Sequence, residues 1–312
     1  MLYDVDGVGI CPSEISANVK DFGAKGDGST NDTAAIQSAL DSCKNTGGVI
    51  YFPEGIYIIT AYLKFYSHQT LWFKNGATLK QGAAISALLL PECASTVTEY
   101  NGTHDCLIYG ATFDGGNYTT NNTLSGAVHA RNIVFENCTF KNAYGAWHDL
   151  EFCGCYNCKI INCDFEGSRK TDANGCLVQI DPIGSTGTWP WSGRGVVDGT
   201  VCKYIEVSGC IFHDCTIAPG IGNHSGSDAS PDELIRVHDC IFDGLTTNRA
   251  AIQLNKGTAV DVYNNTFNNC KYGVGYADST YCIHDNRFIG VTTAFGSNAN
   301  GYNNMINGTF TA

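Results

Sequence analysis

Ile205–Cys215, IEVSGCIFHDC, is one copy of a unit that recurs along most of the chain. Each copy is centred on a phenylalanine, with apolar or small residues at fixed offsets on both sides. The clear copies are centred on Phe140, Phe165, Phe212, Phe242, Phe267 and Phe288, and weaker ones on Phe113 and Phe310. Gly, Asn or Asp stands before and after the phenylalanine, and these residues tolerate the left-handed conformation of a sharp corner. Each copy therefore predicts two strands separated by corners, followed by a third strand.

The spacing of these copies predicts one elongated, all-β parallel β-helix. The chain has 312 residues, and successive phenylalanines are 21 to 47 residues apart. Repeats at such spacings form solenoids in which each coil buries its inward face against its neighbours. We expect a single β-helix domain over 19–312, with regular coils over about 105–312, and an arm or linker over 1–18. Asn31 or Asp32 as an N-cap, before apolar residues at helical spacing, predicts an amphipathic cap helix over about 31–44.

Residues 19–57 carry a family signature, VKDFGAKGDGSTNDTAAIQSALDSCKNTGGVIYFPEGIY. It closely resembles the N-terminal signature of the pectate-lyase-like superfamily of right-handed parallel β-helices. The shared pattern is D-F-G-A-x-G-D-G-x-x-D-x-x-A-I-Q-x-A, then G-G-x-V/I-x-F-P-x-G-x-Y. With the coil repeats, the resemblance covers residues 19–312 and implies a right-handed β-helix. The superfamily includes polygalacturonase-like hydrolases, lyases, epimerases, fructotransferases and bacteriophage tailspikes, so the fold does not select the chemistry.

The net charge and the first residues of the chain indicate which partners and which location to expect. The net charge is −12 with no basic run, so we expect neither nucleic acid nor an anionic membrane as a partner. No apolar stretch is long enough to span a bilayer. The first residues, MLYDVDGVGI, lack a basic n-region with an apolar core, so we expect no secretion signal in this chain.

The sixteen cysteines favour a core of reduced thiols over a disulfide scaffold. Most lie in or beside the inward columns of the repeat, where a free cysteine behaves as a small buried hydrophobe. Cys153, Cys155 and Cys158 suggest zinc at first sight, but Cys158 falls in the core register and no second Cys/His pair has matching spacing. We therefore predict no metal site and no cofactor, with structural or catalytic calcium as the alternative left open.

The third strand of each coil carries the most interesting polar residues. We place Val178, Ile221, Ile252, Val274 and Phe295 inward. The next, outward column then holds Gln179 and Gln253 alternating with glycines such as Gly222, which we expect to lower the surface and make room for a ligand. Asp181 and His224 share the following outward column. His148 is expected near Gln179, in a strand whose register the sequence fixes only to within one residue.

Four residues are candidates for catalysis: Asp181, His224, Glu151 and Asp172. Adjacent coils lie about 4.8 Å apart, so Asp181 can orient and charge His224. Asp181 could also pair with a second carboxylate, Glu151 or Asp172. Glycosidases use two carboxyl groups about 5–5.5 Å apart for retention or about 6.5–9.5 Å apart for inversion. The alternative is an Asp–His pair that only stabilises the surface of the sheet.

The candidate substrate-binding residues are Trp189, Trp191, His148, Gln179, Gln253 and Arg249. Both tryptophans lie in a long loop over 182–201, where indole rings can stack on sugars, and amide side chains can hydrogen-bond to sugar hydroxyls. The alternatives are tryptophans that pack under their own loop and an Arg249 that forms a structural ion pair instead of binding a carboxylate or sulfate.

The leading hypothesis is a carbohydrate-active protein that binds and hydrolyses a polysaccharide along the third-strand face. A polysaccharide lyase and a non-catalytic glycan-binding module of a phage tail are the alternatives. Motifs of the polygalacturonase-like branch are absent or distorted; Gly222-Asn223-His224 only loosely matches G-H-G. The resemblance to tailspikes, together with the thiols and the missing signal, implies a homotrimer in a phage virion tail or outside the cell after release.

Overall fold

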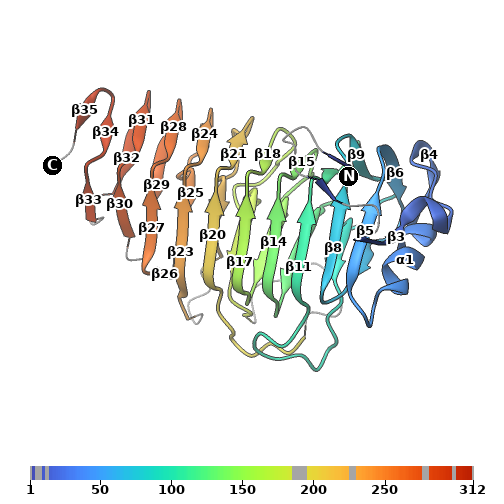
Figure 1. Ribbon diagram of the computed structural model, residues 1–312. Helices are drawn as coiled ribbons and strands as arrows, with labels where there is room; N and C mark the ends of the chain where they lie inside the picture. The colour runs from blue at the N-terminus through green and yellow to red at the C-terminus, as the bar shows by residue number, and fades with distance from the viewer. Residues whose placement is uncertain are drawn as a thin grey trace.

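The computed structural model describes residues 2–3, 9–10, 14–184, 195–224, 230–275, 281–296 and 300–310. It is a right-handed parallel β-helix, as predicted (Figure 1). Three long sheets run along the solenoid. Each coil contributes one strand to each sheet, except that the first and last coils have no strand in the third sheet. No described helix is long and apolar enough to cross a membrane.

The first sheet contains the strand that opens each coil. Its strands, in order, are β3 (Ile15–Asn18), β5 (Gly48–Phe52), β8 (Gln69–Phe73), β11 (His104–Tyr109), β14 (Arg131–Glu136), β17 (Tyr156–Ile161), β20 (Lys203–Ser208), β23 (Asp232–His238), β27 (Val260–Tyr263), β30 (Tyr281–His284) and β33 (Asn300–Tyr302), with β26 (Gly257–Thr258) beside β23. All described pairings within it are parallel.

The second sheet contains the short strand that carries the repeat phenylalanine. Its strands are β4 (Asp27–Asn31), β6 (Gly55–Ile59), β9 (Ala77–Gln81), β12 (Thr112–Asp114), β15 (Thr139–Lys141), β18 (Asp164–Glu166), β21 (Ile211–His213), β24 (Ile241–Asp243), β28 (Thr266–Asn268), β31 (Arg287–Ile289), β34 (Met305–Ile306) and β35 (Thr309–Phe310).

The third sheet carries the candidate site. Its strands are β7 (Leu63–Phe65), β10 (Leu89–Pro91), β13 (Ser125–Val128), β16 (Leu150–Cys153), β19 (Val178–Asp181), β22 (Ile221–Gly222), β25 (Ile252–Gln253), β29 (Tyr272–Gly275) and β32 (Thr293–Phe295). Outside the three sheets, β1 (Leu2–Tyr3) and β2 (Gly9–Ile10) form an antiparallel pair.

The repeat phenylalanines form a continuous ladder in the core. Register pairs them coil by coil from Phe113 to Phe288. Successive rings stack with centroids 4.6–5.0 Å apart, as in Phe165, Phe212 and Phe242. The predicted copy at Phe310 was wrong: Ile306 pairs with Phe288, and Phe310 lies on β35, which turns back antiparallel to β34.

The corner residues adopt the left-handed backbone that the sequence predicted. The first corner has φ between 52° and 63° at Asn137, Asn162, Gly209, Asp239, Asn264 and Asp285. Most of the second corners do the same, for example Asp214 at 54° and Gly290 at 63°. Only Gly, Asn and Asp adopt this region cheaply, so these columns fix where each coil bends.

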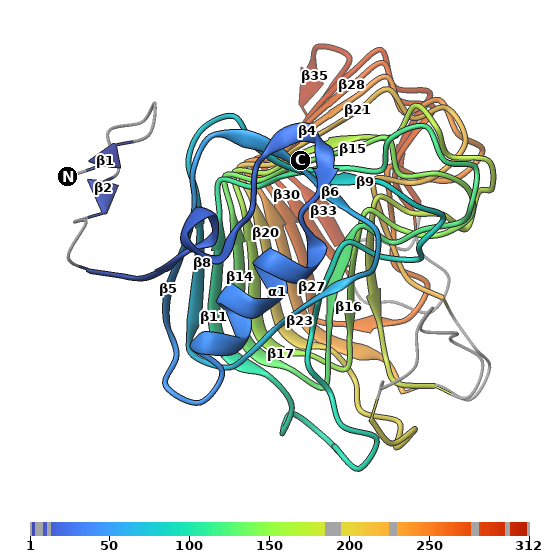
Figure 2. The same cartoon turned by 90° about the vertical axis from the view of Figure 1, so that its right-hand side faces the viewer.

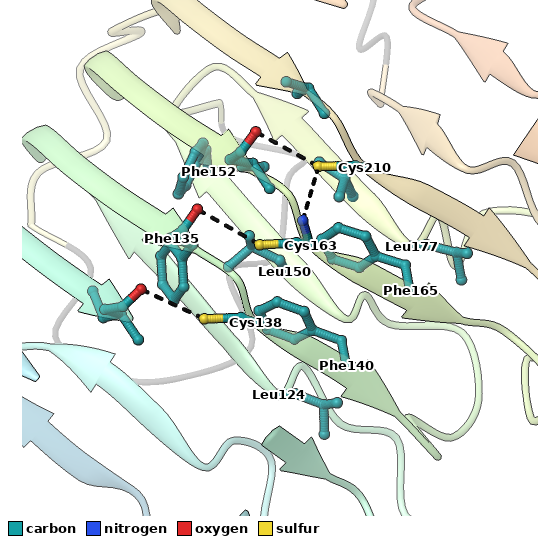
Figure 3. Close-up of a cluster of buried hydrophobic side chains, with 14 of the residues drawn as sticks. Leu124, Phe135, Cys138, Phe140, Leu150, Phe152, Cys163, Phe165, Leu177 and Cys210 are labelled. Carbon is teal, nitrogen blue, oxygen red and sulfur yellow. Dashed lines mark hydrogen bonds between the residues drawn. The ribbon is translucent and has the colours of Figure 1, made fainter. Parts of the chain in front are cut away.

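A column of thiols lies beside the phenylalanine ladder (Figure 3). Cys138, Cys163 and Cys210 each donate from Sγ to a backbone carbonyl of the preceding coil, at 3.5–3.6 Å. Further along, Asn265 and Asn286 take over the column and donate from Nδ2 to the equivalent carbonyls at 2.8–2.9 Å. All fifteen cysteines within the described ranges are free thiols. Cys155, from the group considered for zinc, donates to Ala127 O instead.

The N-terminal end of the solenoid is covered by α1 (Thr33–Ser42), which lies across the open end of the coils (Figure 2). Ile36, Ala39 and Leu40 are buried there against the core. A short 3-10 helix, Val19–Phe22, precedes it. The first sheet already includes β3, Ile15–Asn18, which lies within the stretch expected to be an arm.

Candidate functional site

The third sheet has the inward and outward faces that the sequence predicted for its later coils. Val178, Ile221, Ile252, Val274 and Phe295 are register partners in sequence. The outward column beside them runs Glu151, Gln179, Gly222, Gln253 and Gly275. The register partner of Gln179 is Glu151, and His148 precedes β16.

Asp181 and His224 form the centre of the site. The Asp181 carboxylate accepts two hydrogen bonds from His224, one from the backbone N–H at 2.7 Å and one from ring Nδ1 at 2.8 Å. Gln179 Nε2 donates to Asp181 Oδ1 at 2.8 Å and lies 2.8 Å from His224 Nδ1. Burial alone would lower the pKa of His224, but the hydrogen bond and charge of Asp181 outweigh it and raise this pKa. The aspartate thus orients the histidine and favours its protonated form.

Glu151 places a second carboxyl beside Asp181. Its side chain is buried, and desolvation, together with the charge of Asp181, raises the pKa of Glu151 well above 4.5. Its Oε2 atom has no hydrogen-bond partner among the described residues. Glu151 is therefore stabilised in its protonated form, beside an Asp181 carboxyl that accepts hydrogen bonds from His224 and Gln179.

His148, which precedes β16, lies against the same cluster. Its ring centroid is 5.4 Å from that of His224, and its Nδ1 atom donates to Cys176 O at 3.0 Å. Burial, then the nearby charges of His224 and Lys170, hold the pKa of His148 well below 6.5. The cluster is compact and closed: Asp181 and Glu151 are 3% and 4% exposed, whereas His224 exposes 42% of its side chain.

The remaining candidates lie around this centre or outside the described residues. Arg249 Nη2 donates to Asn174 Oδ1 at 2.7 Å and forms no described ion pair. Asp172 is exposed, and its carboxylate caps its own turn by accepting from Asn174 N. Gln253 Nε2 donates to Asn255 Oδ1 at 2.9 Å. Trp189 and Trp191 lie outside the described residues.

Gly222 does not open space for a ligand. A Cβ atom at this position would collide with the Cys176 sulfur, so the cysteine already fills the volume that the glycine leaves. The glycine is needed because the Cys176 side chain crosses directly over the β22 backbone. The expectation that glycine lowers the surface here was therefore wrong.

Two contacts of buried carboxyl groups close to the site were not predicted from the sequence. Lys170 pairs with Asp149 at 2.7 Å, with both side chains fully buried, and donates to Trp147 O. Desolvation, partly offset by Lys170, raises the pKa of Asp149 to about 6. Asp232 is also buried and accepts from Asn223 Nδ2, the residue before His224. Only the fold reveals these contacts, because each joins segments from different coils.

Replacing Glu151 by glutamine should stabilise the protein above pH 4.5. Because the pKa of Glu151 is raised in the folded state, the unfolded chain ionises first and stability falls as pH rises above 4.5. Glutamine does not ionise, so the variant avoids this loss. We expect the free energy of unfolding of Glu151→Gln to exceed that of the wild type by about 1–3 kcal/mol at neutral pH and to equal it at pH 4. Urea unfolding of both proteins across pH measures this. Glu136→Gln, at the end of β14, should show no such pH-dependent gain, and an equal gain there would contradict the assignment.

Comparisons with known proteins place this architecture in a family. The chain is 28% identical over 307 residues to plasmin and fibronectin-binding protein A of Streptococcus pneumoniae, covering 88% of this chain and 39% of that protein. It therefore spans about two fifths of the length of that relative. The crystal structure of that surface adhesin, PfbA, matches with a TM-score of 0.74 at 22% identity, covering 92% of this chain and 77% of that one.

An exopolygalacturonase from Thermotoga maritima has the same fold, with a TM-score of 0.61 at 16% identity over 89% of this chain and 74% of that one. The match of residues 16–298 to one family, together with the three-sheet solenoid, settles the classification. The chain belongs to the family described as rhamnogalacturonase A/epimerase, pectate lyase-like.

Proposed function

We propose that the protein binds a polysaccharide along the outward face of the third sheet and hydrolyses it at the Asp181–Glu151 pair. The observation that carries this proposal is a pair of neighbouring carboxyl groups in different surroundings: the pKa of Glu151 is raised by burial, and Asp181 accepts two hydrogen bonds from His224. Glycoside hydrolysis needs such a pair: a protonated acid for the leaving oxygen and an ionised carboxylate for water or the sugar. Membership of a carbohydrate-related β-helix family supports the substrate class.

In this proposal Glu151 is the general acid and Asp181 the base or nucleophile. The Oε2 atom of Glu151 is buried and has no hydrogen-bond partner among the described residues, so it would donate to a glycosidic oxygen once the closed cluster opens to admit the sugar. His224 holds Asp181 in place and is the member of the cluster that a ligand meets first, since it is the exposed one. Gln179 and His148 are buried against Asp181 and His224 and would hold these two side chains in position.

A second candidate function is glycan or protein binding without cleavage. It rests on the likeness to a plasmin and fibronectin-binding protein over 88% of this chain. A polysaccharide array with mass spectrometry of the products distinguishes hydrolysis, elimination and binding without cleavage. Hydrolysis gives new reducing ends, elimination by a lyase gives unsaturated ends that absorb in the ultraviolet, and binding alone gives retention with no products.

The pH profile of hydrolysis should carry the signature of Glu151. Since the acid acts in its protonated form and its pKa is raised well above 4.5, kcat/KM should stay high past pH 4.5 and fall as pH rises through that pKa. His224→Gln should retain this falling limb, although with lower activity. Loss of the limb in His224→Gln would assign it to the histidine instead and remove Glu151 as the acid.

A further inference from the structure

Cys282 differs from the core thiols because it lies on the solvent face of the first sheet. Within the described ranges, only Cys282 and Cys93 are partly exposed, and the other cysteines are buried. The outward column that Cys282 joins holds Glu206, Arg236 and Asp261 on the preceding coils. A thiol therefore stands where this face otherwise carries charged side chains, and the packing that explains the core thiols does not explain it.

Three side chains of different chemistry meet at this point. Asp261 on β27 is the register partner of Cys282 on β30, and His284 follows two residues later on the same face. One ligand atom from each of the three lies within 4.8 Å of the others, and Asp261 Oδ1 is 3.1 Å from His284 Nε2. Zinc bonds of about 2.0–2.3 Å in a tetrahedron place ligand atoms about 3.3–3.8 Å apart. Small rotamer adjustments thus suffice to close the group around an ion.

His284 is oriented as a metal ligand would be, and His104, His213 and His238 are held by the following aspartate in the same way. The Nδ1 atom of His284 donates to Asp285 Oδ2 at 2.7 Å, which turns Nε2 towards Asp261 and Cys282. Metal-binding histidines are held in this way, by a carboxylate that accepts from the ring nitrogen opposite the metal. Asp285 is itself fixed at the corner, with φ of 56°.

We propose that Asp261, Cys282 and His284 form a zinc-class divalent metal site, supported by Asp285. Carboxylate, thiolate and imidazole are the ligand set that zinc prefers, and the two negative charges match a divalent ion. On binding, Zn²⁺ takes the place of the Cys282 thiol proton, which goes to solvent, and bonds to His284 through Nε2. A fourth position stays open beside a cavity of about 480 Å³ lined in part by Arg236, Asp261 and Cys282.

The test is titration of the reduced, full chain with Co²⁺ as a spectroscopic probe and with Zn²⁺ in competition. We expect a near-ultraviolet thiolate-to-cobalt charge-transfer band that Zn²⁺ removes. Cys282→Ser should abolish the band, His284→Ala should weaken metal binding at least about 100-fold, and Asp285→Asn about 10- to 100-fold. Circular dichroism of each variant checks that the solenoid is intact.

Two matched controls keep the result specific. Cys93→Ser removes the other thiol that is partly exposed within the described ranges. His238→Ala removes a histidine paired with Asp239 in the same way, but with Arg236 in place of a cysteine in the outward column. Both should keep the band. The exposed group His68, His104 and Asp105 contains no sulfur, so metal bound there adds no thiolate band. Absence of the band in the wild type, or its persistence in Cys282→Ser, overturns the proposal.

Discussion

Asp181→Asn is expected to lower kcat for polysaccharide hydrolysis by about 10²- to 10⁴-fold, the usual contribution of a positioned acid or base. Asparagine keeps the volume and one acceptor oxygen, so His224 N–H retains a partner, but the charge that orients and protonates the imidazole is lost. Binding of the glycan should change far less than kcat, because the fold and the exposed face remain. The rate at which products form from a defined oligosaccharide measures kcat, and calorimetry measures the affinity for the same oligosaccharide.

The control for this variant is Asp164→Asn. Asp164 accepts from His213 Nε2 at 2.9 Å on the second sheet, so it forms the same kind of Asp–His pair on a different face. It should leave hydrolysis unchanged. Full activity in Asp181→Asn on a confirmed substrate would remove the catalytic assignment and leave the pair a stabilising contact of the sheet surface.

Phe212→Ala should destabilise the protein by about 3–5 kcal/mol, the cost of deleting a fully buried aromatic side chain. Phe212 is stacked on both sides, with ring centroids 5.0 Å from Phe165 and 4.8 Å from Phe242. Removing its side chain opens a cavity in the ladder. The rings on either side cannot move in to fill it, because their own strands hold them in register. Urea unfolding followed by circular dichroism measures the change in the free energy of unfolding.

The neighbouring residue supplies the control. Ile211 points outward and is 42% exposed, so Ile211→Ala should change stability by no more than about 0.5 kcal/mol. If Phe212→Ala does not fold, Phe212→Leu tests the same ladder with a smaller loss. Equal effects of the two alanine variants would mean that the ladder does not hold the coils together.

The site could be predicted from the sequence only in part, and the third sheet shows why. Asp181 and His224 were found because they occupy one outward column of neighbouring repeats, and the structure joins them at 2.8 Å. Glu151 was named as a partner of Asp181, but His148 was expected near Gln179. Leu150 and Phe152 alternate with Asp149 and Glu151, so the pattern indicates which side chains face inward. It does not say which residue lies opposite Gln179 on the next coil, because the sequence does not mark where this strand begins.

The sequence by itself determined the solenoid: the phenylalanine column, the Gly, Asn and Asp corners, the cap helix and the thiols of the core. These follow from local rules repeated in every coil, since each residue type either fits a left-handed corner or fills the inward face. Only the tertiary structure decided that Glu151 and not Asp172 lies beside Asp181, that Lys170 pairs with Asp149, and that Asp261 meets Cys282 and His284. Those contacts depend on the register between strands that lie 21 or more residues apart, and loops of unequal length leave that register open until the coils are stacked.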